Sequence, residues 1–139
     1  MSNKNKGILW GLISLLIMGS IFGFSNQTSQ ESGSLSLQLA KWLLPMMEIN
    51  TAHFIVRKLA HFTIYAALGF SIYRSFSFLF EKKPSIFLIC ILIVVVYAGL
   101  DEFHQLFVSG RSGEWRDICI DSCGGFLGSS LSFWVRQWF

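Results

Sequence analysis

The chain has 139 residues, enough for one domain, and its composition is much more apolar than that of a typical soluble protein. Apolar residues make up 53% of the chain and charged residues 14%, whereas soluble domains average about 25% charged residues. This composition favours an integral membrane protein over a soluble helical domain. The net charge of +3 is small. No basic cluster stands out, which argues against nucleic-acid binding.

The apolar segments predict an all-α membrane protein, which we expect to form a single domain over residues 1–139. The four predicted transmembrane helices cover about 7–24, 55–80, 85–107 and 117–138. The first could also be a signal peptide, but no cleavage pattern follows it. Residues 25–36 are rich in Ser, Gln and Asn and predict a loop. Residues 34–44 predict a short interfacial helix, and residues 81–84 a tight turn.

A one-sided polar stripe closes the third predicted span. On a helix, Asp101, His104 and Gln105 fall within an arc of roughly 100°, and Glu102 lies just off that arc. Such a stripe at the end of a membrane-length segment is costly unless it faces other protein or water. We therefore expect the rest of the chain to supply its partners.

Two other predicted spans carry ionisable residues that could meet this stripe. Arg57 and His61 lie one helical turn apart near the start of the second span, with Lys58 adjoining. In the fourth span, Asp117 and Asp121 share a narrow arc with the sequence Gly-x-x-x-Gly at 124–128, which lets a neighbouring backbone approach closely. Because successive spans alternate in direction, the polar ends of the second, third and fourth spans should meet at one face.

The distribution of charges predicts the orientation of the chain. With both termini in the cytoplasm, the inner ends of the spans carry a net positive charge and the outer ends a net negative charge. The polar face would then lie outside. Cys119 and Cys123, on the side of their helix away from Asp117 and Asp121, are expected to act as small apolar residues toward lipid or neighbouring helices.

Several motifs, in order along the chain, carry a resemblance to a known family. They are Phe24-Ser-Asn-Gln, Arg57-Lys-x-x-His-Phe-x-x-Tyr65, Asp101-Glu-x-x-Gln105 with Arg111, and Asp117-x-x-x-Asp121-x-x-Gly124. With these motifs the chain resembles the VanZ-like family of small bacterial integral membrane proteins. The family often has Asn where this chain has Asp121, so an acidic and a purely hydrogen-bonding role both stay open.

The resemblance implies a multi-pass protein of the bacterial cytoplasmic membrane with a role in the cell envelope. The family is named for a protein that accompanies glycopeptide-resistance genes and lowers susceptibility to teicoplanin. The resemblance does not indicate which biochemical activity the protein has. The expected partners are therefore membrane lipid and a lipid-linked cell-wall precursor or glycopeptide-related ligand.

The first functional hypothesis is recognition or masking of an anionic, lipid-linked or surface ligand at the outer face. Basic side chains would hold its phosphate or carboxylate, and Arg111 suits two parallel hydrogen bonds. The candidate ligand-binding residues are Arg57, Lys58, Glu102, Gln105, Arg111 and Asp117.

The second hypothesis is an enzyme acting on a phospholipid or cell-wall precursor. A histidine would be the general base, oriented by an aspartate, with Arg111 stabilising negative charge. The candidate catalytic residues are His61, Asp101, His104 and Asp121. We expect no cofactor and no metal. The same four residues could bind a metal only as a variant of this hypothesis, and a His-Glu-x-x-His motif is absent. A third hypothesis is a purely structural network of ion pairs.

Overall fold

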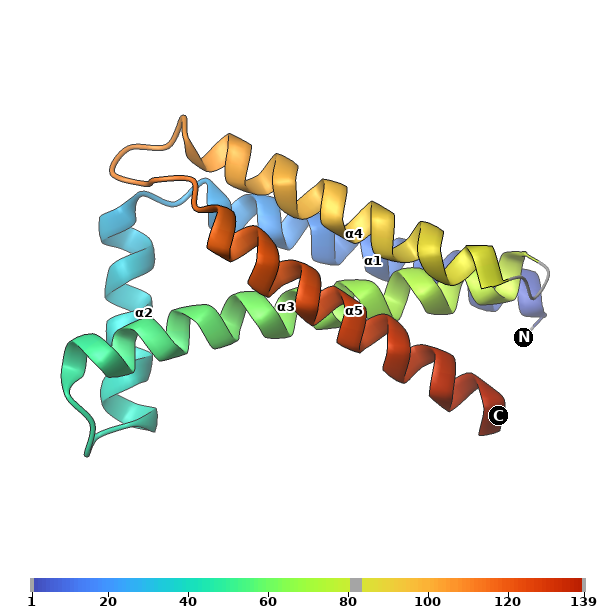
Figure 1. Ribbon diagram of the computed structural model, residues 1–139, viewed down its shortest axis with the longest axis horizontal. Coiled ribbons are helices and arrows are strands. Elements are labelled where there is room, and N and C mark those ends of the chain that lie inside the picture. Colours follow the sequence, from blue (N-terminus) through green and yellow to red (C-terminus); the bar gives the residue numbers. More distant parts are fainter. Residues whose placement is uncertain (1, 81–83, 139) are drawn as a thin grey trace.

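The computed structural model describes residues 2–80 and 84–138, and in these residues every regular element is a helix (Figure 1). The elements are α1 (Asn3–Ser25), α2 (Ser29–Leu43), α3 (Ile49–Leu79), α4 (Pro84–Gln105) and α5 (Trp115–Trp138). The predicted all-α fold is therefore confirmed. The turn predicted at residues 81–84 lies outside the described residues except for Pro84, which begins α4.

Helices α1, α3, α4 and α5 extend along the long axis of the molecule, and α2 lies across them at one end (Figure 1). α3 occupies the middle and contacts each of the other helices. Both chain termini lie at the end of the molecule opposite α2 (Figure 1). The end near α2 holds the start of α3, the end of α4 and the start of α5, which are the segments that carry the predicted polar residues.

Three helices are long and apolar enough to cross a membrane, which indicates a multi-pass membrane protein. They are Asn3–Ser25, Ser85–Gln105 and Trp115–Val135. The sequence predicted four such spans, and α3 is the one that is not among them. Its sequence carries basic residues near its start and the buried serines Ser71, Ser75 and Ser77 further along. Because other helices surround α3, it meets more protein and less lipid, and an apolar surface on all sides is unnecessary.

The starts of α2 and α3 differ most from the predicted boundaries, and capping explains both. α2 begins at Ser29 rather than near 34, so most of the predicted 25–36 loop is helical. The Thr28 hydroxyl accepts a hydrogen bond from Glu31 N (3.3 Å), and the Glu31 carboxylate accepts one from Thr28 N (2.9 Å). α3 begins at Ile49 rather than 55, because the Glu48 carboxylate accepts hydrogen bonds from the first turn. α4 ends slightly early, at Gln105 rather than 107.

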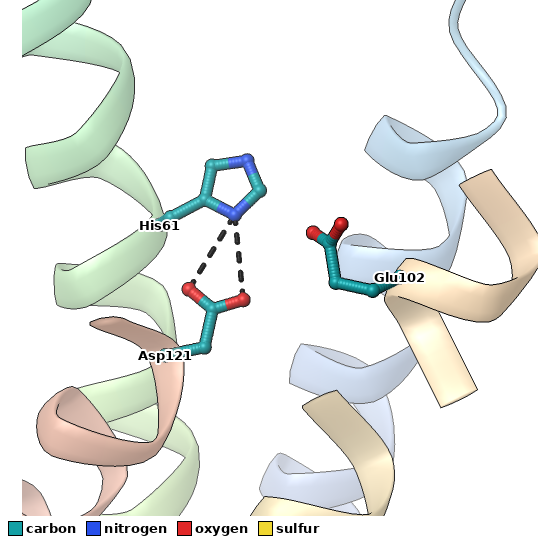
Figure 2. A group of neighbouring side chains, drawn as sticks. All are labelled: His61, Glu102 and Asp121. Carbon is teal, nitrogen blue, oxygen red and sulfur yellow. Dashed lines mark hydrogen bonds and ion pairs between the residues drawn. The ribbon is translucent and has the colours of Figure 1, made fainter. Parts of the chain in front are cut away.

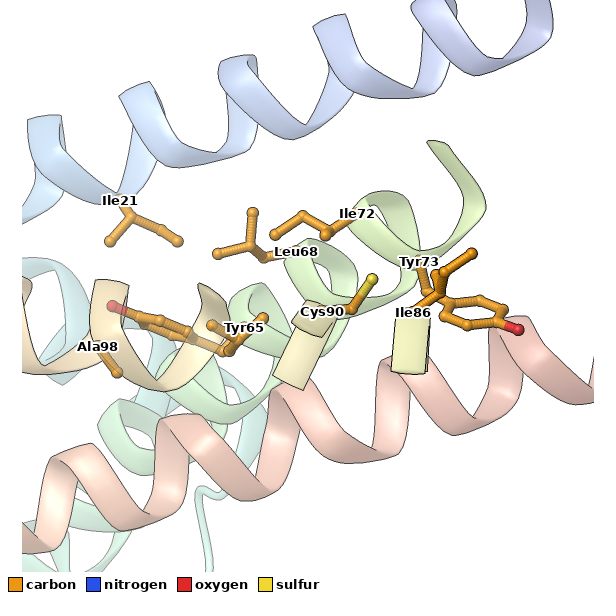
Figure 3. Packing of buried hydrophobic residues seen from close by; sticks show 9 residues of the cluster. Ile21, Tyr65, Leu68, Ile72, Tyr73, Ile86, Cys90 and Ala98 are labelled. Carbon is orange, nitrogen blue, oxygen red and sulfur yellow. The ribbon is translucent and has the colours of Figure 1, made fainter. Parts of the chain in front are cut away.

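The apolar core lies where α1, α3 and α4 meet (Figure 3). Its buried members are Ile21, Tyr65, Leu68, Ile72, Tyr73, Ile86, Cys90, Val94 and Ala98. Serine hydroxyls add bonds between helices: Ser14 donates to Ser71 Oγ (2.9 Å) and Ser75 to the carbonyl of Gly7 (2.8 Å). Such hydrogen bonds and small residues hold helices together in lipid, where apolar burial alone gives little preference for helix over lipid contact.

The closest helix contact joins α3 and α5. A Cβ atom added to Gly124 would lie 2.3 Å from the carbonyl oxygen of Phe62, and one added to Gly128 would lie 1.8 Å from that of Ala66. Both distances are far below a van der Waals contact, so only glycine fits at these positions. The predicted packing role of this glycine pair is confirmed.

Replacing Gly128 with alanine should therefore push α5 away from α3. We expect Gly128→Ala to lower the free energy of unfolding by about 1–3 kcal/mol, the usual cost of overpacking a closed contact. Denaturant titration in detergent micelles, followed by circular dichroism, measures this change.

Gly19→Ala is the matched control, because a Cβ there would meet nothing within 4 Å. The control should be neutral or stabilising by up to about 1 kcal/mol, through higher helix propensity. Equal stability of the two variants would contradict the close-contact explanation.

Candidate functional site

Except for the half-buried His104, the predicted polar residues of α4 and α5 are buried at the end of the molecule near α2. Asp101, Glu102, Gln105, Asp117 and Asp121 are each at most 5% exposed. Carboxylates this deeply buried require hydrogen-bond donors or cations close by. The site is therefore described by the hydrogen-bond donor or cation that contacts each carboxylate.

Asp101 is held by neutral donors from two helices. Its Oδ1 accepts a hydrogen bond from the hydroxyl of Ser25 (2.6 Å), and its Oδ2 accepts one from Gln105 Nε2 (3.2 Å). Gln105 also donates to Ser25 Oγ (3.2 Å). Ser25 was not among the predicted site residues. Its position in the sequence could have indicated the site, because it directly follows the first predicted span and should lie at the same face as the polar stripe.

The residues beside Ser25 also contact the polar end. Arg111 Nη2 donates to the carbonyl of Phe24 (3.3 Å), and Asn26 Oδ1 lies 2.9 Å from His104 Nε2. The His104 ring also stacks near Phe22, with 4.8 Å between ring centroids. The Phe24-Ser-Asn-Gln motif thus covers the end of α1 and the residues after it, and it contacts the end of α4 and Arg111. His104 faces this segment, and the structure does not bring it to His61 and Asp121.

Among the described lysines and arginines, Lys58 is the one that pairs with carboxylates. Its Nζ forms a short ion pair with Asp117 and lies 3.7 Å from Glu114 Oε2. Its ammonium also lies 5.3 Å from the centroid of the Phe54 ring. Lys58 and Asp117, both predicted as ligand-binding residues, therefore hold each other and connect α3 to the start of α5.

His61, Asp121 and Glu102 form a second group, which Figure 2 shows. His61 Nδ1 lies 3.4 Å from Asp121 Oδ1 and 3.5 Å from Oδ2. Glu102 points toward this pair from α4 (Figure 2). Glu102 Oε2 accepts a hydrogen bond from the backbone N–H of Glu114 (2.8 Å), whereas Oε1 has no hydrogen-bond partner.

A cavity of about 350 Å³ lies between α1, α2 and α3, next to the polar residues. Its lining residues are Ile21, Phe24, Ser25, Gln27, Ser32, Leu35, Ser36, Leu39, Val56, Arg57, Ala60, His61, Ile64, Tyr65, Asp101 and Arg111. Half of these side chains are apolar when Tyr65 is included, and two arginines and Asp101 stand among the others. The apolar members, here called the apolar wall, and the two arginines, here called the cationic wall, thus line the same space together with Asp101.

Neither cavity arginine has an ion-pair partner in the part of the chain that the structure describes. The Nε atoms of Arg57 and Arg111 are buried, and their N–H groups donate to no acceptor among the described residues. Burial, and then the like charge of Arg57, lower the pKa of Arg111 from its usual value. A guanidinium remains protonated at neutral pH even so. Two unpaired positive charges therefore face the same space.

A family model described as VanZ/LLP1 matches residues 10–136 of the chain. Searches among curated proteins and among solved structures gave no match. The motifs that carried the resemblance lie within the matched residues, and the structure brings several of them together at one end of the molecule. Because the family model covers nearly the whole sequence, the chain belongs to the VanZ/LLP1 family.

Proposed function

We propose that this protein binds an amphiphile of the bacterial cell envelope that carries an anionic head and an acyl or prenyl chain. The observation that supports this proposal is the cavity with one apolar and one cationic wall. Lipid-linked cell-wall precursors and lipid-bearing glycopeptides have this chemistry. Membership of the VanZ/LLP1 family is consistent with a link to glycopeptide resistance.

The apolar wall suits a hydrocarbon chain. Ile21 and Phe24 of α1, Leu35 and Leu39 of α2, and Ile64 of α3 line it. The volume of about 350 Å³ falls within the range of roughly 300–1,000 Å³ that small-molecule sites occupy. Burial of hydrocarbon against such side chains contributes about 25 cal/mol per Å². A chain that leaves the bilayer for this wall still exchanges one apolar surface for another, so the head must supply most of the selectivity.

The cationic wall suits a phosphate or carboxylate head. Arg57 and Arg111 lack ion-pair partners among the described residues, whereas Lys58 is already paired with Asp117. An anion between the two guanidinium groups would relieve their mutual repulsion and could form two parallel hydrogen bonds with either group. Within the predicted ligand-binding set, we therefore assign the head to Arg57 and Arg111.

We also propose that α3 crosses the membrane, with both termini in the cytoplasm and the cavity at the outer face. α1 and α4 both end near the cavity. The segments that follow these two helices meet there, since Ser29 N donates a hydrogen bond to Ser109 O (3.3 Å). Two spans that end at one face must be joined by another crossing. α3 lies between them and has 31 residues. A helix of that length extends about 46 Å, more than the hydrocarbon core of about 30 Å.

An enzyme acting on the same amphiphile is the second candidate function. It is favoured by His61, which lines the cavity and lies 3.4 Å from Asp121. A histidine beside a carboxylate can act as a general base. Loss of turnover without loss of binding in His61→Gln would support the enzyme over the binding protein.

Arg57→Gln and Arg111→Gln should each weaken binding of a long-chain prenyl phosphate. We expect the Kd to rise roughly tenfold or more, because a hydrogen bond to a charged group contributes about 1.5–3 kcal/mol. Titration of a fluorescent prenyl phosphate into nanodiscs that contain the protein measures the Kd. The corresponding prenyl alcohol, which lacks the anion, should bind weakly to all variants.

Arg116→Gln is the matched control for this measurement. Arg116 carries the same charge at the start of α5, is exposed and does not line the cavity. Its replacement should leave the Kd within about twofold, as expected for an exposed charge. If all three variants weaken binding equally, the attraction is a general surface effect and the cavity is not the site.

Cysteine labelling should distinguish four crossings from three. In a background without native cysteines, a membrane-impermeant maleimide should label both Gln27→Cys and Ser109→Cys in intact spheroplasts. Ser2→Cys should react only after permeabilisation. If α3 did not cross, Gln27→Cys and Ser109→Cys would lie on opposite sides, and only one of them would react.

A further inference from the structure

We infer that His61, Glu102 and Asp121 bind one divalent transition-metal ion of the Zn²⁺ or Mn²⁺ class. The three residues come from α3, α4 and α5, and their side chains converge in Figure 2. One potential ligand atom from each residue lies within 4.8 Å of the others. The sequence predicted no metal. The metal-binding variant of the enzyme hypothesis contained His61 and Asp121, but it had Asp101 and His104 where the structure places Glu102.

The separation between His61 and Asp121 fits shared coordination better than a direct hydrogen bond. Nδ1 lies 3.4 and 3.5 Å from the two carboxylate oxygens. Charged N–H···O hydrogen bonds are usually about 2.7–2.9 Å long. Two ligand atoms that are each about 2.0–2.2 Å from one tetrahedral zinc ion lie roughly 3.4 Å apart. Glu102 would complete the set by a small movement of its carboxylate toward the pair.

Buried oxygens without hydrogen bonds point into the same space. Glu102 is 3% exposed and Asp121 is fully buried. Glu102 Oε1 and Asp121 Oδ1 accept no hydrogen bond, although Glu102 Oε2 is fixed by the backbone N–H of Glu114. A fixed carboxylate with one free oxygen is the usual state of a metal ligand whose orientation is set by a neighbouring group.

The neighbouring cations do not neutralise these two carboxylates. Lys58 pairs with Asp117 and Glu114, and within the described residues neither Arg57 nor Arg111 forms an ion pair. Two buried carboxylates then lie close to one imidazole, with one potential ligand atom of each residue within 4.8 Å of the others. A doubly charged cation would balance both, which a protonated histidine alone does not.

The donor set selects the class of metal. One imidazole nitrogen and two carboxylate oxygens suit Zn²⁺ or Mn²⁺, whereas Ca²⁺ and Mg²⁺ prefer oxygen donors alone. Asp101 and His104, which the sequence analysis had grouped with His61 and Asp121, are held instead by Ser25 and Gln105 and by Asn26. This inference does not rest on the proposed amphiphile binding, although His61 lines the cavity as well.

Metal binding can be measured on the untagged full-length protein in nanodiscs without added amphiphile. Cys119 and Cys123 are exposed and one helical turn apart, so both should first be replaced by serine to remove a competing thiol site. After chelator treatment, we expect about one Zn²⁺ or Mn²⁺ per chain by mass spectrometry of the metal. Ca²⁺ and Mg²⁺ should not compete at equal concentration.

Glu102→Gln should weaken Zn²⁺ affinity by roughly 100-fold or more, since loss of a ligand exceeds the 10- to 100-fold effect of losing an outer partner. Glu114→Gln is the matched control. It removes a nearby carboxylate but keeps the backbone N–H that holds Glu102. The control should bind about one ion with nearly unchanged affinity. Absence of binding by the wild type, or equal loss in the two variants, would overturn the inference.

A spectroscopic test on the wild type removes any dependence on the folding of a variant. Pulsed electron paramagnetic resonance of the Mn²⁺-loaded protein should detect coupling to a single histidine nitrogen. Bound Mn²⁺ without nitrogen coupling would overturn the proposed site. Failure here with intact prenyl phosphate binding would leave the proposed function standing, and the reverse result would leave the metal site standing.

Discussion

The backbone contact between α3 and α5 is the constraint on which the polar site depends. Gly124 lies against the carbonyl of Phe62 and Gly128 against that of Ala66, so the two helix backbones touch. His61 precedes Phe62, and Asp121 lies one turn before Gly124. At an ordinary helix separation of about 8–10 Å, filled by side chains between the backbones, these two polar residues would stand further apart. The glycines thus set the distance between an imidazole and a carboxylate.

The charged side chains near this contact differ in the partners that they have. Asp101 accepts hydrogen bonds from a hydroxyl and an amide, Asp117 pairs with Lys58, and Glu102 and Asp121 both lie near His61. The two arginines line the cavity, as Asp101 does. A network that only joined helices would pair these opposite charges, since an unpaired buried charge is costly. Among the described residues, Arg57, Arg111 and Glu102 form no ion pair, and the purely structural hypothesis does not explain this.

Much of this arrangement could be predicted, because helical spacing and alternating direction leave few choices. The inward face of α5 followed from the shared arc of Asp121 and the glycines, and their burial confirms it. Glu102 was harder to place, because its burial depends on the backbone N–H of Glu114 in the following loop. The start of α2 was missed because the Thr28–Glu31 capping box lies in a serine-rich stretch that is typical of loops. α3 was predicted as an ordinary apolar span because the sequence alone does not show that the other helices pack around it.

α2 borders the cavity and carries exposed apolar side chains beside it. Leu35 and Leu39 line the cavity and are both 48% exposed, and Trp42 and Leu43 on the same helix are more exposed still. A helix with such exposed apolar residues, lying across the ends of the spans, suits the boundary between lipid headgroups and acyl chains (Figure 1). Ser36 contacts His53 of α3 at 2.7 Å, which fixes α2 near its middle. An amphiphile could then enter beside α2 with its chain still in the lipid, so only its head would need to reach the arginines.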